Sequence, residues 1–143
     1  MIKNIIIGKN SLITKEICKY LDNVYIFSAN ELSKINFNKK IKNFKKINLV
    51  FNNFYPSKNL NTMNKNDYRK FCDLSLEKIS FILETIPSSK INKIIYTSSS
   101  SIYRIPENLN NQFKDNFNRE LYSSFKLAAE KLILNYSHNK KKE

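Results

Sequence analysis

The chain contains very few of the residues on which many common active sites depend. Its 143 residues include one glycine, one histidine, two cysteines and no tryptophan. With His138 as the only histidine, the sequence lacks the ligands for a zinc site and the base for a histidine-containing catalytic triad. Cys18 and Cys72 lie far apart in predicted helices without metal-site spacing, and we expect them to be reduced thiols in the core.

Long apolar runs are also missing. No run approaches the ~20 residues that a membrane-spanning helix requires, and the apolar start is too short for a signal peptide. A hydrophobic content of 41% over 143 residues is typical of one globular domain with a real core. We therefore expect a cytoplasmic protein that does not interact with a membrane.

Acidic residues are few compared with basic ones. The chain has 25 lysines and arginines against 12 aspartates and glutamates, so a nucleic-acid partner is one hypothesis. The lysines, however, are spread along the whole chain with asparagine and isoleucine, which also fits a biased genome. Arginine, the better reader of phosphates and bases, occurs only at Arg69, Arg104 and Arg119, which argues against nucleic acid. The lysine-rich residues 137–143 are predicted to be a basic, solvated tail.

Short apolar runs alternate with helix-like segments along residues 1–136. The runs predict strands over residues 3–8, 23–28, 47–53 and 91–98, with a shorter extended piece at 35–37. Helical periodicity predicts helices over residues 11–21, 39–46, 66–85 and 119–136. The buried stripe expected on the first is Leu12, Ile13, Ile17, Cys18 and Leu21, and that on the third is Phe71, Leu74, Ile79, Ile82 and Leu83. This alternation without hairpin signals is typical of an α/β domain with a parallel sheet. We expect a doubly wound, Rossmann-like, three-layer α/β/α domain with strand order 3-2-1-4-5.

Tyr122 and Lys126 lie one turn apart on the last predicted helix. An ammonium group at that distance favours the phenolate, and would pull a pKa that starts near 10 toward working pH. A tyrosine that acts as a general base needs such a shift. Taken alone, the pair is better explained as a solvated lysine beside a half-buried tyrosine.

A serine cluster follows the strand predicted at residues 91–98. Open α/β sheets bind ligands at the carboxyl ends of their strands, so these hydroxyl groups lie where a substrate is expected. A serine there can donate a hydrogen bond to a substrate oxygen and share its proton with Tyr122. A serine-rich loop that only caps backbone groups would explain the cluster, but not the Tyr122 and Lys126 pair.

The segments IIYTSSSSIY and LYSSFKLAAEKLI resemble the extended short-chain dehydrogenase/reductase family, the NAD-dependent epimerases and dehydratases of nucleotide sugars. The resemblance implies that Ser99 is the catalytic serine, Tyr122 the general base and Lys126 the ribose-binding lysine. Glu130 matches a glutamate of the same helix. The sequence departs from the family at Arg104, where the family has glycine, and at Phe125, where it has serine.

The N-terminal segment is similar to the family's Gly-x-x-Gly-x-x-Gly turn, with Gly8, Ser11 and Thr14 at the three positions. Glycines at these positions let a pyrophosphate approach the backbone at a helix N-terminus. Ser11 is small enough to cap the helix and leave amides free for phosphate, whereas Thr14 adds bulk. Leu12 and Ile13 match the apolar pair between the last two glycines.

The rest of the implied cofactor site departs from the family pattern. Ser28 stands where the family has an acid for the adenine ribose, and Glu31 follows three residues later, so NAD and NADP both remain open. Phe54 and Tyr55 stand where the family has small alanines and would crowd the nicotinamide. The cofactor-binding residues implied by the resemblance are Gly8, Ser11, Leu12, Ile13, Ser28, Asn36, Phe37, Phe54, Tyr122 and Lys126.

The resemblance ends after the helix that carries Tyr122 and Lys126. The family's later strands and the part that grips the nucleotide sugar have no counterpart in this sequence. We therefore expect a truncated NAD(P)-dependent epimerase or dehydratase domain of polysaccharide biosynthesis, completed by another chain or by a homo-oligomer. The alternative is a non-catalytic remnant that kept the fold as a nucleotide-binding or interaction module.

Overall fold

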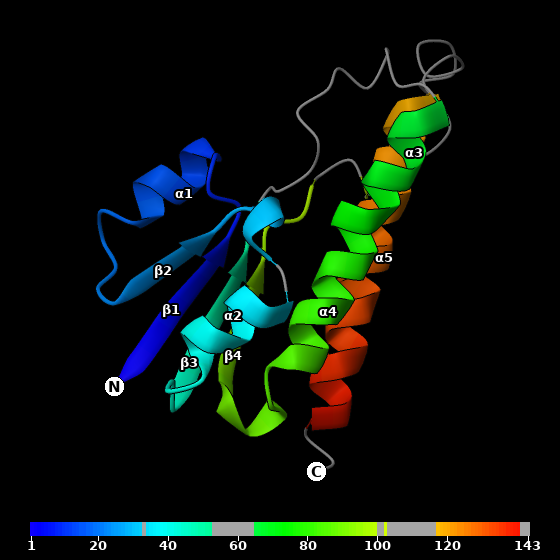
Figure 1. Cartoon of the computed structure of the whole chain (residues 1–143). Coiled ribbons are helices and arrows are strands. Elements are labelled where there is room, and N and C mark those ends of the chain that lie inside the picture. The colour runs from blue at the N-terminus through cyan, green and yellow to red at the C-terminus, as the bar shows by residue number, and fades with distance from the viewer. Residues whose placement is uncertain (33, 53–64, 100–101, 103–116, 141–143) are drawn as a thin grey trace.

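Four runs rich in β-branched residues pair into one sheet (Figure 1). The computed structural model describes residues 1–32, 34–52, 65–99, 102 and 117–140. The strands are β1 (Ile2–Ile7), β2 (Val24–Phe27), β3 (Lys46–Phe51) and β4 (Ile91–Tyr96). The helices are α1 (Leu12–Ile17), α2 (Lys34–Ile41), α3 (Lys65–Cys72), α4 (Lys78–Thr85) and α5 (Phe117–Lys140), with short turns η1 (Ala29–Glu31), η3 (Asp73–Glu77) and η4 (Ser88–Lys90).

All strand pairs are parallel, in the order β2-β1-β3-β4, which confirms the predicted α/β class and parallel sheet. The predicted order 3-2-1-4-5 is wrong, because the extended piece expected at residues 35–37 lies in α2. Phe37 and Ile41, one helical turn apart, are both buried, so this segment covers the sheet as a helix instead of extending it. The other four predicted strands keep their relative order.

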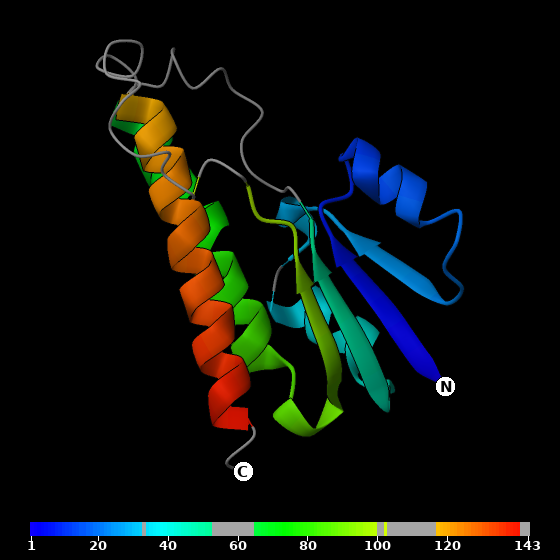
Figure 2. The same ribbon diagram turned by 180° about the vertical axis from the view of Figure 1, so that it is seen from behind.

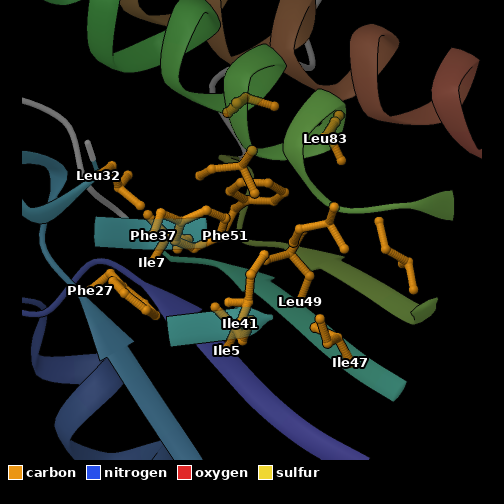
Figure 3. Packing of buried hydrophobic residues seen from close by; sticks show 14 of the residues in the cluster. Ile5, Ile7, Phe27, Leu32, Phe37, Ile41, Ile47, Leu49, Phe51 and Leu83 are labelled. Atoms are coloured by element: carbon orange, nitrogen blue, oxygen red, sulfur yellow. The ribbon is translucent and has the colours of Figure 1, made fainter. Parts of the chain in front are cut away.

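The core lies on one face of the sheet. Ile5 and Ile7 of β1 point to the same side as Leu49 and Phe51 of β3, and all four are fully buried. Figure 3 shows these side chains packed beneath α2 and α4, with Leu83 reaching down from α4. Burying each such side chain stabilises the fold by roughly 1.5–3 kcal/mol, so this face holds the sheet and the helices together.

The segment predicted as one helix over residues 66–85 forms α3, the π-helical turn η3 and α4 in succession. Its predicted inward residues, Phe71, Leu74, Ile79, Ile82 and Leu83, are all buried. The run of α3 to α4 lies beside α5 in both views (Figures 1 and 2). The prediction of this helix and of its buried face is therefore confirmed.

The first and last helices differ from their predicted bounds. α1 is only six residues long, and Leu12, expected on its buried stripe, is 77% exposed, while Thr14 is fully buried. At the other end, α5 extends to Lys140, so the boundary placed after residue 136 falls inside a helix. A stripe of apolar residues is a weak guide for so short a helix, because a single buried polar contact can rotate it.

Among the described residues, no helix is long and apolar enough to cross a membrane. In the same part of the chain, Cys18 and Cys72 are free and only partly buried. We expected the two thiols within the core, but they lie at its margin.

Gly8 ends β1 in a conformation that only glycine adopts readily. Its φ is +123°, and a Cβ atom at this position would lie 1.6 Å from the carbonyl oxygen of Asn52. The chain leaving β1 thus passes directly against the backbone that leaves β3. The single glycine of the sequence is therefore required by contact between two strand ends.

We expect Gly8→Ala to lower the free energy of unfolding by about 3 kcal/mol or more, since both the strained φ and the overlap with Asn52 must be relieved. Urea denaturation followed by circular dichroism measures this change. Asn10→Ala, an exposed position two residues later, is the control and should shift stability by less than about 0.5 kcal/mol. Equal stability of the two variants would contradict the required contact.

Candidate active site at the carboxyl ends of the strands

The residues that follow the four strands form one row at the edge of the sheet. Gly8 N–H donates to the Phe27 carbonyl (2.9 Å), and Asn52 N–H donates to the Ile7 carbonyl (2.7 Å). Thr97 N–H donates to the carbonyl of Phe51 (3.0 Å). These bonds continue the parallel ladder one residue beyond the strands. Residues 8, 28, 52 and 97 therefore meet where an open α/β sheet binds ligands.

Side chains in this row are joined by buried hydrogen bonds. Thr97 Oγ1 donates to Asn52 Oδ1 (3.1 Å), and Asn52 Nδ2 donates to Thr14 Oγ1 (2.8 Å). Thr14 Oγ1 donates in turn to the Gly8 carbonyl (2.7 Å). Asn52 and Thr14 are both fully buried, so the chain of bonds satisfies polar groups that would otherwise be costly to bury.

Ser99, Tyr122 and Lys126 are brought together beside this row. Ser99 follows β4, and its side chain is hydrogen-bonded to Tyr122 of α5. Lys126 Nζ lies 5.7 Å from the centre of the Tyr122 ring and 5.0 Å from that of Tyr96. The three side chains predicted from the sequence therefore form one cluster, although their catalytic roles remain predictions.

Lys126 is buried to an unusual degree for a lysine, with 1% of its surface exposed. Its Nζ donates to the Thr97 carbonyl (2.8 Å) and faces the two tyrosine rings, contacts that suit a desolvated cation. Burial lowers the pKa of Lys126 to about 8, and the charge of Glu130 one turn away opposes this change. The amino group is therefore held inside the protein, beside the two tyrosine rings.

Tyr122 departs from the predicted protonation. Burial raises the pKa of Tyr122 above its ordinary value of 10.0, and the hydrogen bond with Ser99 lowers it by a smaller amount. The expectation that Lys126 would pull this pKa toward neutrality is therefore wrong for this structure. Phe71 stacks edge-to-face on the Tyr122 ring, 6.2 Å between centres, and adds to its burial. At neutral pH the phenol keeps its proton.

The end of β2 carries a carboxylate that the sequence pattern placed too far away. The turn η1 brings Glu31 back to Ser28, where its Oε2 accepts from the backbone N–H (2.7 Å) and from Oγ (2.9 Å). Oε1 of Glu31 pairs with Lys9, 3.3 Å away, next to Gly8. These bonds, above all the one from the Ser28 backbone, lower the pKa of Glu31 to about 2. An ionised acid thus stands beside the glycine turn.

The predicted phosphate turn is open to solvent. Ser11 occupies the N-cap of α1 but makes no capping hydrogen bond with its side chain, contrary to expectation. Its Oγ instead accepts a long bond from Asn52 Nδ2 (3.4 Å). Leu12 and Ile13 are 77% and 50% exposed. These residues are accessible to a ligand, whereas Thr14 fills the space where the resembling family has its third glycine.

Other residues of the predicted cofactor set do not reach the site or cannot be placed. Phe37, which the resemblance implies for cofactor binding, is fully buried in the core, edge-to-face on Phe27 (5.1 Å between ring centres). For Asn36 the structure describes the backbone, in α2, and not the side chain. Phe54 and Tyr55, expected near the nicotinamide, lie outside the described residues.

The sequence patterns did not single out Asn52 and Thr97 as residues of the site, and they placed Glu31 too far along the chain to take part. Asn52 and Thr97 each follow a strand of the sheet directly, and a polar residue at that position is the signal that would have found them. For Glu31 the signal is the spacing Ser28-x-x-Glu31, the pattern of a capping box, which folds the acid back onto the serine.

No family model matches the chain, and no curated protein or solved structure matches it either. Within the described residues, no group of three or more histidine, cysteine, aspartate or glutamate side chains is arranged to hold a metal ion. The function must therefore be inferred from the site itself.

The lowered pKa of Lys126 predicts a specific pH dependence of stability. The folded chain releases this proton near pH 8 and the unfolded chain near 10.5, so between these values the folded state binds fewer protons and stability rises with pH. We expect wild type to gain roughly 2 kcal/mol relative to Lys126→Met between pH 7 and 9.5. Urea denaturation at the two pH values measures the difference, below the range in which Tyr122 titrates.

The matched control is Lys131→Met, an exposed lysine on the same helix. This substitution should leave the pH dependence of wild type unchanged. A wild-type curve parallel to that of Lys126→Met would contradict the burial of the charged group.

Proposed function

We propose that the chain is the nucleotide-binding part of an NAD(P)-dependent oxidoreductase, of the epimerase or dehydratase type that acts on nucleotide sugars. One observation carries the proposal: Ser99 is hydrogen-bonded to Tyr122, beside the buried amino group of Lys126. This cluster stands at the carboxyl ends of parallel strands, which is the general location of dinucleotide and substrate sites in such sheets. The resemblance of the two C-terminal segments to the extended short-chain dehydrogenase/reductase family supports the same assignment.

We also infer the finer fold, a doubly wound three-layer sandwich. The core cluster beneath α2 and α4 contains no residue of α1, and α1 lies away from α4 and α5 in both views (Figures 1 and 2). Ile6 and Val50 point to the opposite face of the sheet and are also buried. A second covered face is the arrangement that these observations favour.

The residues at the edge of the sheet fit a dinucleotide in most respects. The Gly8 turn is followed by the exposed Leu12 and Ile13, which leaves the approach to the start of α1 open. The Glu31 carboxylate offers an acceptor for ribose hydroxyl groups. When bound, a nicotinamide dinucleotide supplies the hydride transfer that none of the amino-acid side chains can perform.

The chain's own residues hold and move the proton. Because burial keeps the Tyr122 phenol protonated at neutral pH, Tyr122 can donate its proton to a substrate oxygen. The Ser99 hydroxyl, hydrogen-bonded to the phenol, stabilises the phenolate that results and can polarise the same oxygen. The positive charge of Lys126 beside the ring stabilises that anion further. This set therefore suits delivery of a proton to a carbonyl group.

The geometry favours NAD over NADP. Glu31 is ionised, 39% of its side chain is exposed, and it lies at the end of β2 where an adenine ribose is held in dinucleotide-binding domains. A fixed negative charge accepts from the ribose 2′-hydroxyl and repels a 2′-phosphate. Lys9 neutralises this charge only in part, because the two side chains meet at the exposed surface.

A second candidate, a non-catalytic module with the same fold, is favoured by two other observations. Thr14 fills the glycine turn with a buried side chain, and Lys126 Nζ is engaged with the Thr97 carbonyl. Both features reduce the room for a cofactor. The two candidates differ in whether the chain binds a dinucleotide.

Titration with NAD(H) and NADP(H), followed by thermal stabilisation, tests the proposal. We expect a rise in melting temperature at millimolar cofactor, since a ligand at ten times its Kd adds about 1.4 kcal/mol of stability. Tyr122→Phe should bind the cofactor within about twofold of wild type, because the phenol acts on the substrate, whereas Lys126→Ala should bind about tenfold more weakly.

Lys131→Ala, which removes an exposed lysine from the same helix, controls for the loss of positive charge and should bind like wild type. Absence of stabilisation by all four nucleotides would reject the oxidoreductase proposal and leave the non-catalytic module.

Glu31→Gln tests the choice of cofactor. Glutamine keeps the acceptor that the Ser28 capping interaction needs and removes only the charge. We expect wild type to bind NAD more tightly than NADP, and the substitution to reduce that preference about tenfold. Isothermal titration with both nucleotides measures the ratio. An unchanged ratio would show that Glu31 does not face the ribose.

A further inference from the structure

A series of buried and partly buried hydrogen bonds at the edge of the sheet leads from the glycine turn to the amino group of Lys126. Lys126 Nζ donates to the carbonyl of Thr97 (2.8 Å), and the hydroxyl of Thr97 donates to Asn52 Oδ1 (3.1 Å). Beyond Asn52 the bonds continue through Thr14 to the carbonyl of Gly8. Asn52 is the middle member of this series and stands on the central part of the sheet, at the end of β3.

We propose that Asn52 is a positioning residue for Lys126: its side-chain amide fixes Thr97, and the Thr97 carbonyl fixes the amino group beside Tyr122. Its value for catalysis rests on the proposed function, whereas its effect on the amino group does not. The Asn52 side chain bonds to Thr97 and Thr14, so its effect on Lys126 passes through Thr97.

The position of Thr97 depends on β3 because β4 is an edge strand of the described sheet. Thr97 lies just beyond the end of β4, and its N–H and its hydroxyl both bond to the carbonyl of Phe51, at 3.0 and 3.2 Å. The hydroxyl has a single hydrogen, which lies within reach of two acceptors, and Asn52 Oδ1 is the nearer of them at 3.1 Å. These three contacts together determine where the Thr97 carbonyl points.

An amide is the side chain that suits the position of Asn52. Its Oδ1 accepts from Thr97 while its Nδ2 donates to Thr14, so the residue must present an acceptor to one side and a donor to the other. A carboxylate has no donor for Thr14, and an aliphatic side chain has neither group. Since Asn52 is fully buried, water cannot replace either bond without rearrangement.

The amino group of Lys126 needs this fixed acceptor because it is desolvated. A buried ammonium group without a hydrogen-bond acceptor is costly, and a carbonyl that moves by about 1 Å no longer provides a good bond. If the carbonyl moves, its bond to the amino group weakens, and we expect the group to leave its place beside the Tyr122 ring. Loss of the Asn52 amide is thus expected to expose the amino group while α5 stays folded.

Lysine side-chain ¹⁵N NMR at pH 6 observes the amino group directly. A buried, hydrogen-bonded ammonium group exchanges its hydrogens slowly and gives a protected ¹H–¹⁵N signal, which Lys126→Ala identifies by its disappearance. We expect Asn52→Leu to abolish this signal. The matched control is Asn48→Leu, on the same strand, where the side chain bonds to Asn4 (2.9 Å) and Asn92 (2.8 Å), away from Lys126. The control should keep the protected signal.

A second pair of variants keeps the proposal testable if Asn52→Leu does not fold. Thr97→Val preserves the shape of the side chain but removes the hydroxyl that binds Asn52, so it should abolish the protected signal. Thr97→Ser retains the hydroxyl and should restore it. A protected signal that persists in Asn52→Leu or in Thr97→Val overturns the proposal, and so does its absence from wild type.

Dinucleotide titration separates this inference from the proposed function. If wild type binds a dinucleotide, Asn52→Leu should weaken binding about as much as Lys126→Ala does, roughly tenfold, and Asn48→Leu should not. If wild type binds none, the proposed function fails, and the NMR comparison alone decides the role of Asn52. A third outcome is that Asn52→Leu binds the dinucleotide as tightly as wild type and yet lacks the protected Lys126 signal. This result would show that Asn52 positions the amino group but that the amino group does not contribute to dinucleotide binding, which overturns the proposed role of Asn52 in catalysis.

Discussion

The close approach of Gly8 to the carbonyl of Asn52 determines how the ends of the strands meet. Because a Cβ atom at residue 8 would overlap that oxygen, β1 and β3 can end side by side only with glycine at this position. Once they do, Thr14 and Asn52 come within hydrogen-bonding distance, and β4 is drawn in through Thr97. One backbone contact, between Gly8 and Asn52, therefore sets how the ends of β1, β3 and β4 lie beside the cluster of Ser99, Tyr122 and Lys126.

Burial acts in opposite directions on the two titrating groups of the cluster. In both groups burial penalises the charged form. It therefore raises the pKa of Tyr122, which is charged without its proton, and lowers the pKa of Lys126, which is charged with its proton, to about 8. The same desolvation strengthens the hydrogen bonds that Ser99 and Thr97 make to these side chains. At neutral pH the phenol thus carries a proton while the lysine remains mostly charged, although its pKa now lies close to neutral pH.

The sequence was sufficient to predict features that depend on local patterns. Apolar runs and helical periodicity predicted the parallel sheet and the buried face of residues 66–85, and the spacing of Tyr122 and Lys126 predicted that they share a helix face. Features that depend on tertiary contact were missed. Phe37 lies in a helix, where its side chain is buried against the apolar face of the sheet. Asn52 is a site residue because Gly8 lets the end of β1 pack against it.

Thr14 of α1 connects the turn after β1 to the hydrogen bonds at the strand ends. Its hydroxyl donates to the Gly8 carbonyl and accepts from Asn52 Nδ2, so one side chain pairs two polar groups inside the protein. The side chain that narrows the turn also ties it to the strand that holds Thr97 and, through Thr97, to Lys126. The side chain of Thr14 in the turn and the amino group of Lys126 are therefore coupled through hydrogen bonds. A ligand that displaces Thr14 is expected to disturb the position of Lys126.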